Sequence, residues 1–421
     1  MRRFITLILL LFAGTMLCGA QTFQKDTLNS GIRNYQDEIG YFQIANRDMG
    51  DPLFMFHDEK GRIDLGLGGT AKVSAFYGFA GEVPTTGFNP ALITLPTEKN
   101  TQFGMRISGT EVHVKARSWI GRHKIIAYVK FGGNDDKSVN VSQAYLSLDG
   151  FSIGLIPSFF MDREVGAMTT GMSHNCSIDL THTLVGYTAR LGERIRLGVS
   201  AEQPNFSIDY IGDKYRLKTT YQPMPDFCTY FKYKFDDGHL QANAVFRNLT
   251  YWDSPLIFGA GNGEERHIFG YGGSLSGHIQ KSKKLKLSWQ FCGGAGITSY
   301  LSDLGGLNLD VGLSNTPDEK DHYKLSATPV SSGMISAELN WTDNLASSIL
   351  VNHTHTYHKK TFNYDDETTD CLSAAVNLFW YMSEYSYFGA EYIFGRRTVP
   401  VGNGYLSGIA NRLVAVIAFC F

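Results

Sequence analysis

The sequence has 421 residues, with 38 Lys and Arg against 40 Asp and Glu, which gives a formal net charge of -2. Hydrophobic residues make up 43% of the chain and charged residues only 19%. This composition excludes a generally disordered chain, because so much apolar surface can form a large core. The near-neutral balance gives the chain as a whole no electrostatic attraction to nucleic acid or to an anionic membrane surface. The 45 Gly beside only 12 Pro favour many strands joined by tight turns.

The first twenty residues predict export. A basic start is followed by an apolar run from Phe4 to Phe12, and small residues precede a cleavage ahead of Gln21. A lipoprotein signal ending at Cys18 is the alternative, but the bulky Leu17 before this cysteine disfavours lipidation. We therefore expect residues 1–20 to be a signal peptide.

The cysteines that remain after this segment are scattered: Cys176, Cys228, Cys292, Cys371 and Cys420. An odd, scattered set forms neither a disulfide framework nor a CxxC metal motif, so we expect no bound metal and no cofactor. The rest of the sequence contains no apolar run of about eighteen residues, so a membrane-spanning helix is not expected. A chain of this kind crosses a membrane only as a closed barrel, in which every backbone group is paired.

From about Arg62 onward, the chain reads as one β-strand after another. Polar and apolar residues alternate most clearly from Arg194 to Glu202. The same period predicts sixteen strands, near 62–79, 103–119, 123–131, 141–148, 151–161, 182–191, 194–203, 225–235, 239–251, 266–279, 285–300, 328–341, 345–358, 370–382, 386–397 and 407–421. Short connections such as Asp149-Gly150 alternate with long ones such as 301–327. Tight turns at one end and long loops at the other are typical of outer-membrane barrels.

The end of the chain supports the same prediction. The last apolar residues occupy alternate positions: Leu413, Ala415, Ile417, Phe419 and Phe421. A terminal aromatic residue on an alternating strand is typical of bacterial outer-membrane barrels, although any all-β domain can close on such a strand. Residues 62–421 are thus predicted to be an all-β transmembrane antiparallel barrel. The polar segment 21–61 has no clear strand, and we expect a periplasmic extension or a plug.

Alternate residues of a strand point to opposite faces, so if the apolar residues face lipid, the residues between them face the lumen. Residues that point to the same face share one parity. The predicted pore-lining residues are Arg106, His113, Lys115, Arg117, Lys124, Lys130, Arg190, Arg194, Arg196, Lys232, Arg247, Lys286 and Arg397. The parity changes after Arg106, which predicts a β-bulge at Gly109. A cationic wall lowers the barrier for anions, so we expect anions such as carboxylates or phosphate to be favoured. The alternative is that many of these residues lie at the rim and only meet solvent.

A barrel of about sixteen strands has a lumen too wide for side chains alone to fill. The loop 162–181 is a candidate for folding inward, and its candidate constriction residues are Asp162, Arg163, Glu164 and Asp179. An external cap is the alternative for this loop.

Three short motifs stand out along the predicted strands: Arg62 to Val73, Gln143 to Ser147 followed by Ser158 to Asp162, and Tyr387 to Arg397. They resemble the DcaP-like trimeric porins, which belong to a wider group with the phosphate-selective porins. In that family they resemble the opening strand, the hairpin that leads into the third loop and the penultimate strand. The resemblance implies a sixteen-stranded homotrimeric porin in the outer membrane of a Gram-negative bacterium, passing small solutes and favouring negatively charged ones.

Two other functions stay open from the sequence. A surface adhesin or binding barrel would use its long external loops to recognise a partner. An outer-membrane hydrolase would need a nucleophile and an orienting group beside His353 and His355, but the sequence has no GxSxG motif and no metal-ligand spacing. We expect no enzyme and no nucleic-acid partner. The expected partners are small anionic or polar solutes, outer-membrane lipid and further copies of the chain.

Overall fold

The computed structural model describes residues 54–57, 63–81, 83–85, 87–97, 100–211, 215–255, 263–313, 324–357, 370–402 and 404–421. The predicted signal peptide and most of the 21–61 segment lie outside these residues, and their roles stay predictions. None of the helices in the described part of the chain is long and apolar enough to cross a membrane.

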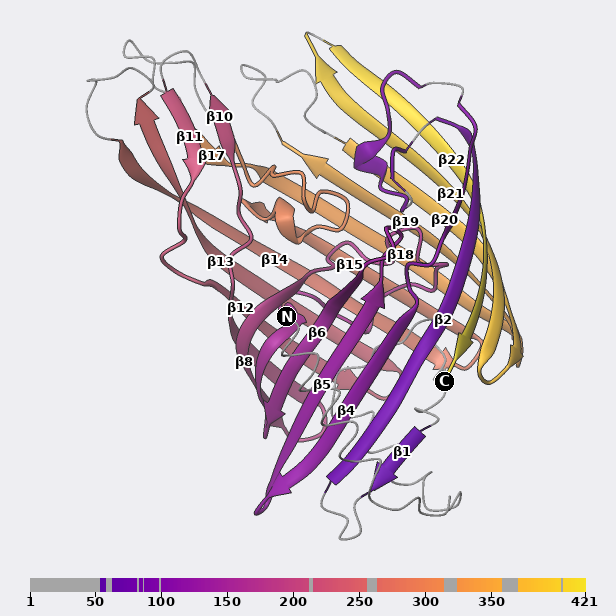
Figure 1. The fold of residues 1–421 in the computed structure, drawn as a ribbon. Coiled ribbons are helices and arrows are strands. Elements are labelled where there is room, and N and C mark those ends of the chain that lie inside the picture. The colour runs from indigo at the N-terminus through magenta and orange to yellow at the C-terminus, as the bar shows by residue number, and fades with distance from the viewer. Residues whose placement is uncertain are drawn as a thin grey trace. The chain divides into compact units, whose positions relative to one another are not determined.

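The described strands form a closed antiparallel barrel, around which the chain runs in sequence order (Figure 1). The first half consists of β2 (Ile63–Ala80), β3 (Gln102–Arg106) with β4 (Glu111–Ile120), β5 (His123–Gly133), β6 (Val139–Leu148), β7 (Phe151–Pro157), β8 (Thr181–Leu191), β9 (Ile195–Glu202) and β12 (Asp226–Phe235). The second half consists of β13 (Gly238–Pro255), β14 (Glu264–Ser282), β15 (Leu285–Ala295), β18 (Pro329–Thr342), β19 (Leu345–Thr356), β20 (Asp370–Ser383), β21 (Ser386–Val401) and β22 (Gly404–Cys420). With β3 and β4 counted as one interrupted strand, the described residues give the sixteen strands that the sequence predicts.

The long connections of this barrel contain shorter strands and 3₁₀ turns. β10 (Asp209–Ile211) pairs with β11 (Tyr215–Thr219). β11 also pairs with the C-terminal end of β13, beyond the part of β13 that pairs with β12. β16 (Val311–Leu313) and β17 (Leu325–Ala327) form a separate hairpin, and η1 (Pro90–Leu92) and η2 (Thr298–Tyr300) are single 3₁₀ turns. These additions all lie within the long connections.

The predicted ends of two strands are wrong. The strand predicted over 151–161 ends at Pro157, and the strand predicted over 285–300 ends at Ala295. In the second case Gly296 takes a φ of +74°, which breaks the extended conformation. In both places the apolar residues that follow pack inside the barrel instead of continuing its wall, so hydrophobicity alone extends the predicted strand too far.

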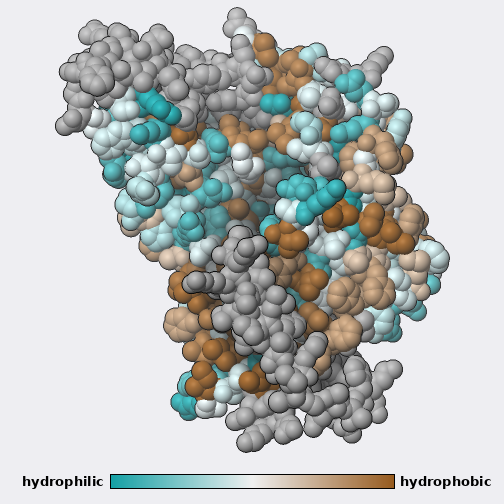
Figure 2. Space-filling model, in the orientation of Figure 1, coloured by the Kyte–Doolittle hydropathy of each residue, from teal (hydrophilic) through white to brown (hydrophobic). Residues whose placement is uncertain are grey.

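The two faces of the barrel wall differ in chemistry. On β22, Leu413 is 51% and Ile417 54% exposed, whereas Val414 and Val416 between them are buried. The same alternation recurs around the wall and gives an apolar outer surface, which is what lipid requires. Figure 2 shows hydrophobic residues over the lower half of the view and mainly hydrophilic residues around β10 and β11 at the upper left.

The barrel closes between its first and last strands. β2 pairs with β22 from Thr70 to Ala80, and the Gly69 and Phe421 backbones exchange hydrogen bonds of 2.7 and 2.9 Å. A side chain at Gly69 would place its Cβ 2.5 Å from the Glu111 carbonyl oxygen, so this closure needs glycine. Where β22 ends, a short β1 (Phe54–His57) takes over the same edge of β2. The 21–61 segment therefore contains a strand that the sequence analysis missed.

The predicted β-bulge at Gly109 is confirmed. β2 faces β3 at the Ser74–Arg106 pair and β4 at the Thr70–Glu111 pair, so β2 has three residues between the pairs and its partner has four. Gly109 has a φ of +92°, in the left-handed region that favours glycine. The extra residue brings both Arg106 and His113 to the inner face.

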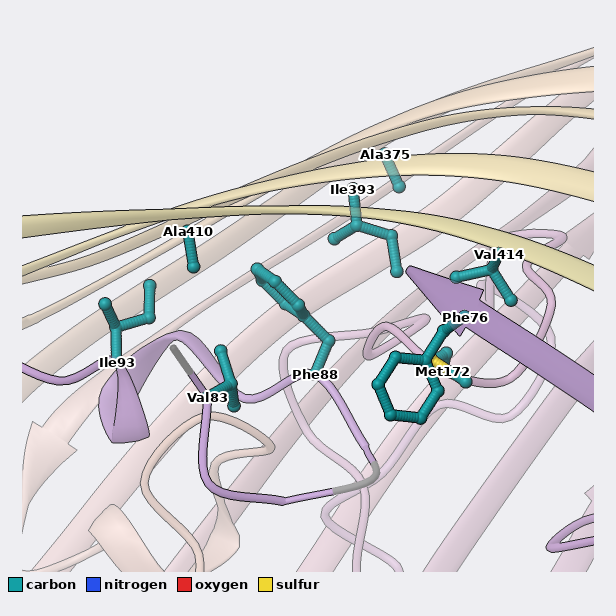
Figure 3. Close-up of a cluster of buried hydrophobic side chains, with 9 residues drawn as sticks. All are labelled: Phe76, Val83, Phe88, Ile93, Met172, Ala375, Ile393, Ala410 and Val414. Atoms are coloured by element: carbon teal, nitrogen blue, oxygen red, sulfur yellow. The ribbon is translucent and has the colours of Figure 1, made fainter. Parts of the chain in front are cut away.

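An apolar cluster fixes the loop 81–101 to the inner wall. The cluster joins Val83, Phe88 and Ile93 of this loop to side chains of β2, β20, β21 and β22 (Figure 3). Phe88 lies over Gly395, where a Cβ would come within 2.7 Å of its ring. Met172, from a second loop, belongs to the same cluster, so two segments far apart in sequence pack together inside the barrel.

Truncation of Phe88 tests whether this cluster holds the loop. Phe88→Ala is expected to destabilise the fold by about 3–5 kcal/mol, the usual cost of emptying a buried aromatic site. Urea unfolding of the detergent-solubilised protein measures the loss. Phe103→Ala is the matched control, because Phe103 is 70% exposed on the outer face of β3. Equal losses in both variants would contradict the packing of the 81–101 loop described here.

Candidate functional site

The loop 158–180 crosses the interior of the barrel between β7 and β8. Its residues contact the inward-facing side chains of β12 to β15 and β18 to β22, on the far side of the barrel from the strands that carry it. A single segment can contact the inward-facing side chains of so many strands only from inside a closed barrel. The loop therefore lies in the lumen, along the wall formed by the second half of the chain.

Asp162 anchors the start of this loop. Its fully buried carboxylate contacts Lys232 Nζ at 3.2 Å, His239 Nε2 at 2.6 Å and the Ser276 hydroxyl at 2.7 Å. Burial by itself would raise the pKa of Asp162, but the charges of Lys232 and His239 outweigh burial and lower it. Asp162 is therefore ionised, and it ties the loop to β12, β13 and β14.

The middle of the loop is held by its backbone. Met168 N–H donates to Glu338 Oε1 at 3.0 Å, and the Met168 carbonyl accepts from Ser348 and Asn377 at 2.6 and 2.7 Å. Polar groups of β18, β19 and β20 thus satisfy both backbone groups of one buried loop residue.

Glu391 on β21 holds the part of the loop that follows. Its carboxylate accepts from the Thr170 backbone N–H at 2.6 Å and from the Ser173 hydroxyl at 2.7 Å. Glu391 is 2% exposed, so this contact lies away from bulk solvent.

A second inner loop, 296–310, supports the end of the first. Asp303 is fully buried and contacts His174 Nδ1, Asn352 and Thr354, each at 2.8 Å. Burial opposes protonation of His174, but the hydrogen bond and charge of Asp303 prevail and raise the pKa of this imidazole. Gln290 accepts from the N–H groups of Ser177 and Ile178, which completes the attachment of the 158–180 loop.

Basic residues gather on the wall that faces away from these anchors. His113, Lys115 and Arg117 on β4, Lys124 and Lys130 on β5, Arg190 on β8 and Arg196 on β9 share the inward parity of their strands. Two of them have carboxylate partners on the same wall. Arg117 Nε donates to Asp64 at 2.7 Å, and Lys130 Nζ lies 2.5 Å from Glu111. Arg190 and Arg196 are direct cross-strand partners, and Lys232 is the next partner of Arg196.

Several predicted pore-lining residues take other places. Arg194 lies in the turn before β9, where its side chain is 57% exposed and pairs with the exposed Asp236. Arg247 is 1% exposed and contacts Asp226 and Asp310 at 2.9 and 2.8 Å, so it fixes the 296–310 loop and does not face an open lumen. Strand parity gives the inward direction of Arg247 but cannot show that a loop covers it.

The remaining predicted residues are engaged with the inner loops or with neighbouring strands. Lys232 contacts Asp162 and Glu164, and Lys286 lies opposite Glu338 and is 5% exposed. Arg397 donates to the Ile93 carbonyl at 3.2 Å, and Arg163 donates to the Pro157 carbonyl at 3.1 Å. These cations hold the walls and loops together.

A cavity of about 470 Å³ lies where the 81–101 and 158–180 loops approach β3. Its lining residues are Thr85, Gly87, Phe88, Asn89, Leu92, Arg106, Thr169, Gly171, Met172, Ser173, His174, Asn175 and Asp179. Arg106 pairs with Asp135 at 3.4 Å, and Lys72 Nζ lies 2.7 Å from where a Cβ on Gly171 would sit. Basic groups of β2 and β3 thus border the narrow region between the two loops.

The sequence analysis missed one cation and a buried carboxylate in this interior. Lys72 alternates with the apolar residues of β2, so strand parity could have identified it, as the same parity places Arg412 of β22 on the lumenal side. Arg412 lies with its guanidinium carbon 4.2 Å from the Phe76 ring centroid and donates to the Gly87 carbonyl. Asp303 lies in a loop, where no strand period marks its direction.

His353 and His355, the residues behind the hydrolase alternative, lie on the outer parity of β19. His353 Nε2 contacts Asp370 at 2.8 Å, and His355 Nδ1 lies 3.5 Å from the same carboxylate. Their imidazole side chains are 48% and 31% exposed. They thus face outward, away from the cavity and the inner loops.

Comparisons with known proteins agree with this architecture. A family model described as "Porin subfamily" matches residues 62–375. The outer-membrane channel DcaP of Acinetobacter baumannii superimposes with a TM-score of 0.71 at 16% identity, over 88% of this chain and all of that one. OmpT of Vibrio cholerae, as expressed in the outer membrane, gives 0.52 at 10% identity over 87% of this chain and all of that one. The trimer form of in-vitro folded OmpT gives 0.51 at 11%, over 86% of this chain and all of that one. Among curated proteins, none matches significantly.

Loss of the Glu391 carboxylate tests the attachment of the 158–180 loop. Glu391→Ala leaves the Thr170 N–H and the Ser173 hydroxyl without their acceptor, at a cost of about 1–3 kcal/mol for each buried group. We expect larger and noisier conductance in planar bilayers, because the loop then leaves the wall more often. Glu384→Ala, in the exposed turn after β20, removes a carboxylate that holds no loop and should leave the conductance unchanged. Identical traces for both variants would show that Glu391 does not hold the loop.

Proposed function

The chain belongs to the porin subfamily whose model it matches over most of its length, and is an outer-membrane porin; from that premise we propose that it is a passive diffusion channel for small hydrophilic solutes that favours anions. The solutes we propose are carboxylates or phosphate compounds of small-molecule size. We further propose that the lumen between the 158–180 loop and the walls of β2 to β9 is their path.

The distribution of charge inside the barrel supports this selectivity. The loop sits against the wall of the second half of the chain, where Asp162, Glu338 and Glu391 are buried in its attachment. The carboxylates of that wall therefore face the loop and not the path. Across from it, the charged inward residues of β4, β5, β8 and β9 are mainly basic, with Glu111 and Glu202 as the acidic ones. An excess of fixed positive charge beside a narrow aqueous path attracts anions and repels cations.

The row formed by Arg190, Arg196 and Lys232 supports the same proposal. Like charges directly opposite one another on neighbouring strands destabilise a sheet. Lys232 is balanced by Asp162 and Glu164, but Arg190 and Arg196 face each other on the basic wall. Passing anions would offset this repulsion, which gives the arrangement a use in transport.

The cavity between the two inner loops is the observation that carries the proposal. Arg106 lines it in contact with Asp135, Lys72 borders it, and the raised pKa of His174 favours a third positive charge there, beside the one carboxylate of the lining, Asp179. Its volume of about 470 Å³ falls within the range of small-molecule sites, about 300–1,000 Å³. A guanidinium at a constriction of this size can pair with a carboxylate or phosphate through two hydrogen bonds.

Ion selectivity tests the charge argument directly. We expect an anion-biased reversal potential across a planar bilayer in a potassium chloride gradient. A unit charge about 7 Å from the ion path contributes about 0.6 kcal/mol at the dielectric constant of water, which is about threefold in permeability. Lys72→Gln with Arg106→Gln should therefore weaken the anion bias severalfold.

Arg194→Gln is the control, because it removes one positive charge from an exposed turn outside the lumen. Selectivity that falls equally in the control and in the double variant would contradict the proposed path. A correctly folded wild type without conductance would instead favour an adhesin or binding barrel that uses its external loops.

We also propose that the chain works as a homotrimer, by analogy with the trimer form described for OmpT. Light scattering of the protein extracted from outer membranes in mild detergent should give a protein mass three times that of the mature chain. A monomer mass at all detergent concentrations would refute the trimer and leave the conductance proposal standing.

A further inference from the structure

Three side chains converge at the base of the 158–180 loop, at the end of the barrel with the short turns. Glu164 comes from the loop, His239 from β13 and His278 from β14. The two histidines are direct cross-strand partners, and their rings meet edge to face with centroids 4.6 Å apart. One ligand atom from each of the three residues lies within 4.8 Å of the others.

The two oxygens of the Glu164 carboxylate have different neighbours. Oε1 accepts from Lys232 at 2.9 Å and lies 3.6 Å from Lys234 Nζ, which leaves Oε2 facing His239 Nδ1 at 3.4 Å. Two ligand atoms about 2.0–2.2 Å from a tetrahedral zinc ion lie about 3.3–3.6 Å from each other. The separation of Oε2 and Nδ1 is therefore the edge length of such a site, and it is long for a direct hydrogen bond.

Each of the two imidazoles has a buried ring nitrogen that can bind a further partner. Among the described residues, neither His239 Nδ1 nor His278 Nδ1 has a hydrogen-bond partner, although both atoms are buried. His239 is 1% exposed, so an unpartnered ring nitrogen there carries the cost of a buried polar group. An ion that binds this lone pair would remove the cost.

Asp162 stands behind His239 as a supporting carboxylate. Its Oδ2 lies 2.6 Å from His239 Nε2, so the imidazole donates its Nε2 proton to Asp162 and presents Nδ1 as an acceptor. Metal-binding histidines usually donate their second ring N–H to a carboxylate in this way, which fixes the tautomer and orients the ring. Lys232 and Ser276 in turn hold Asp162 in place.

The charges around the cluster are close to balanced. Lys232 contacts both Asp162 and Glu164, Lys234 Nζ lies 3.6 Å from Glu164, and Lys286 lies opposite Glu338 on β18. Glu164 is 25% exposed, so the cluster has access to solvent in the lumen. We propose that Glu164, His239 and His278 bind a divalent transition-metal ion of the zinc type, with a water molecule as fourth ligand.

This donor set selects among metals. Imidazole nitrogens suit zinc, copper and nickel, whereas magnesium and calcium prefer oxygen ligands only. No sequence motif predicts this metal site, because His239 and His278 lie far apart in the chain and Glu164 lies in a loop. Only the pairing of β13 with β14 and the inward course of the loop bring the three together. A bound ion would cross-link the loop to the wall.

Metal binding to the full mature protein tests the site without reference to transport. The protein is purified in detergent without a polyhistidine tag, stripped with a chelator and titrated with Zn²⁺ against a chromophoric competitor. We expect one Zn²⁺ per chain, no comparable binding of Mg²⁺, and X-ray absorption showing nitrogen and oxygen ligands at about 2.0–2.1 Å. His278→Gln and Glu164→Gln should each weaken binding at least about tenfold.

His353→Gln is the matched control, since it removes an outward histidine from β19 and should leave Zn²⁺ affinity unchanged. Heat-resistant migration of the folded band on gels confirms that each variant has folded. Stoichiometric binding that persists in both His278→Gln and Glu164→Gln would place the ion elsewhere and overturn the proposal. Absence of stoichiometric binding in the folded wild type would overturn it as well, leaving His239 as a histidine shared between two carboxylates.

Discussion

Pairing of the backbone along the seam between β2 and β22 is the constraint on which the rest of the structure depends. A hydrocarbon environment leaves an unpaired N–H or C=O without a partner, so a membrane sheet must close on itself. Here closure is completed by Phe421 against Gly69 and continued along the same edge by β1. In the closed sheet, apolar side chains face lipid and the side chains that alternate with them face the lumen. Side chains alone cannot fill a lumen of this width.

The filling of that lumen explains the distribution of polar residues. Three buried carboxylates bind segments of chain: Asp162 and Glu391 hold the 158–180 loop, and Asp303 joins it to the 296–310 loop. Each buried backbone group of the loop that these side chains satisfy would otherwise cost free energy. Because these acidic residues are used for attachment, we propose that the basic residues of the opposite wall set the charge beside the path. A chain that is nearly neutral overall would then have a positively charged lumen.

Strand positions and side-chain directions were predictable because a period of two repeats locally along the wall. The opening strand predicted over 62–79 is observed as Ile63–Ala80, and the slip at Gly109 was visible as a change of parity. Arg194 and Arg247 show where this reasoning fails. Parity gives the face of a residue, but it tells nothing about whether a turn exposes it or a loop covers it. The partners of the 158–180 loop come from strands up to 240 residues away in sequence, and no local pattern encodes such contacts.

The long reach of these contacts also sets an order in time. The 158–180 loop is synthesised and exported before β12 to β22, yet its partners are on those strands. Asp162 can meet its partners once β12 to β14 are in place, but Thr170 and Ser173 find their acceptor only when Glu391 of β21 has joined the wall. The full attachment of the loop therefore requires nearly the whole second half of the chain, so the narrowing of the lumen depends on the last strands of the wall.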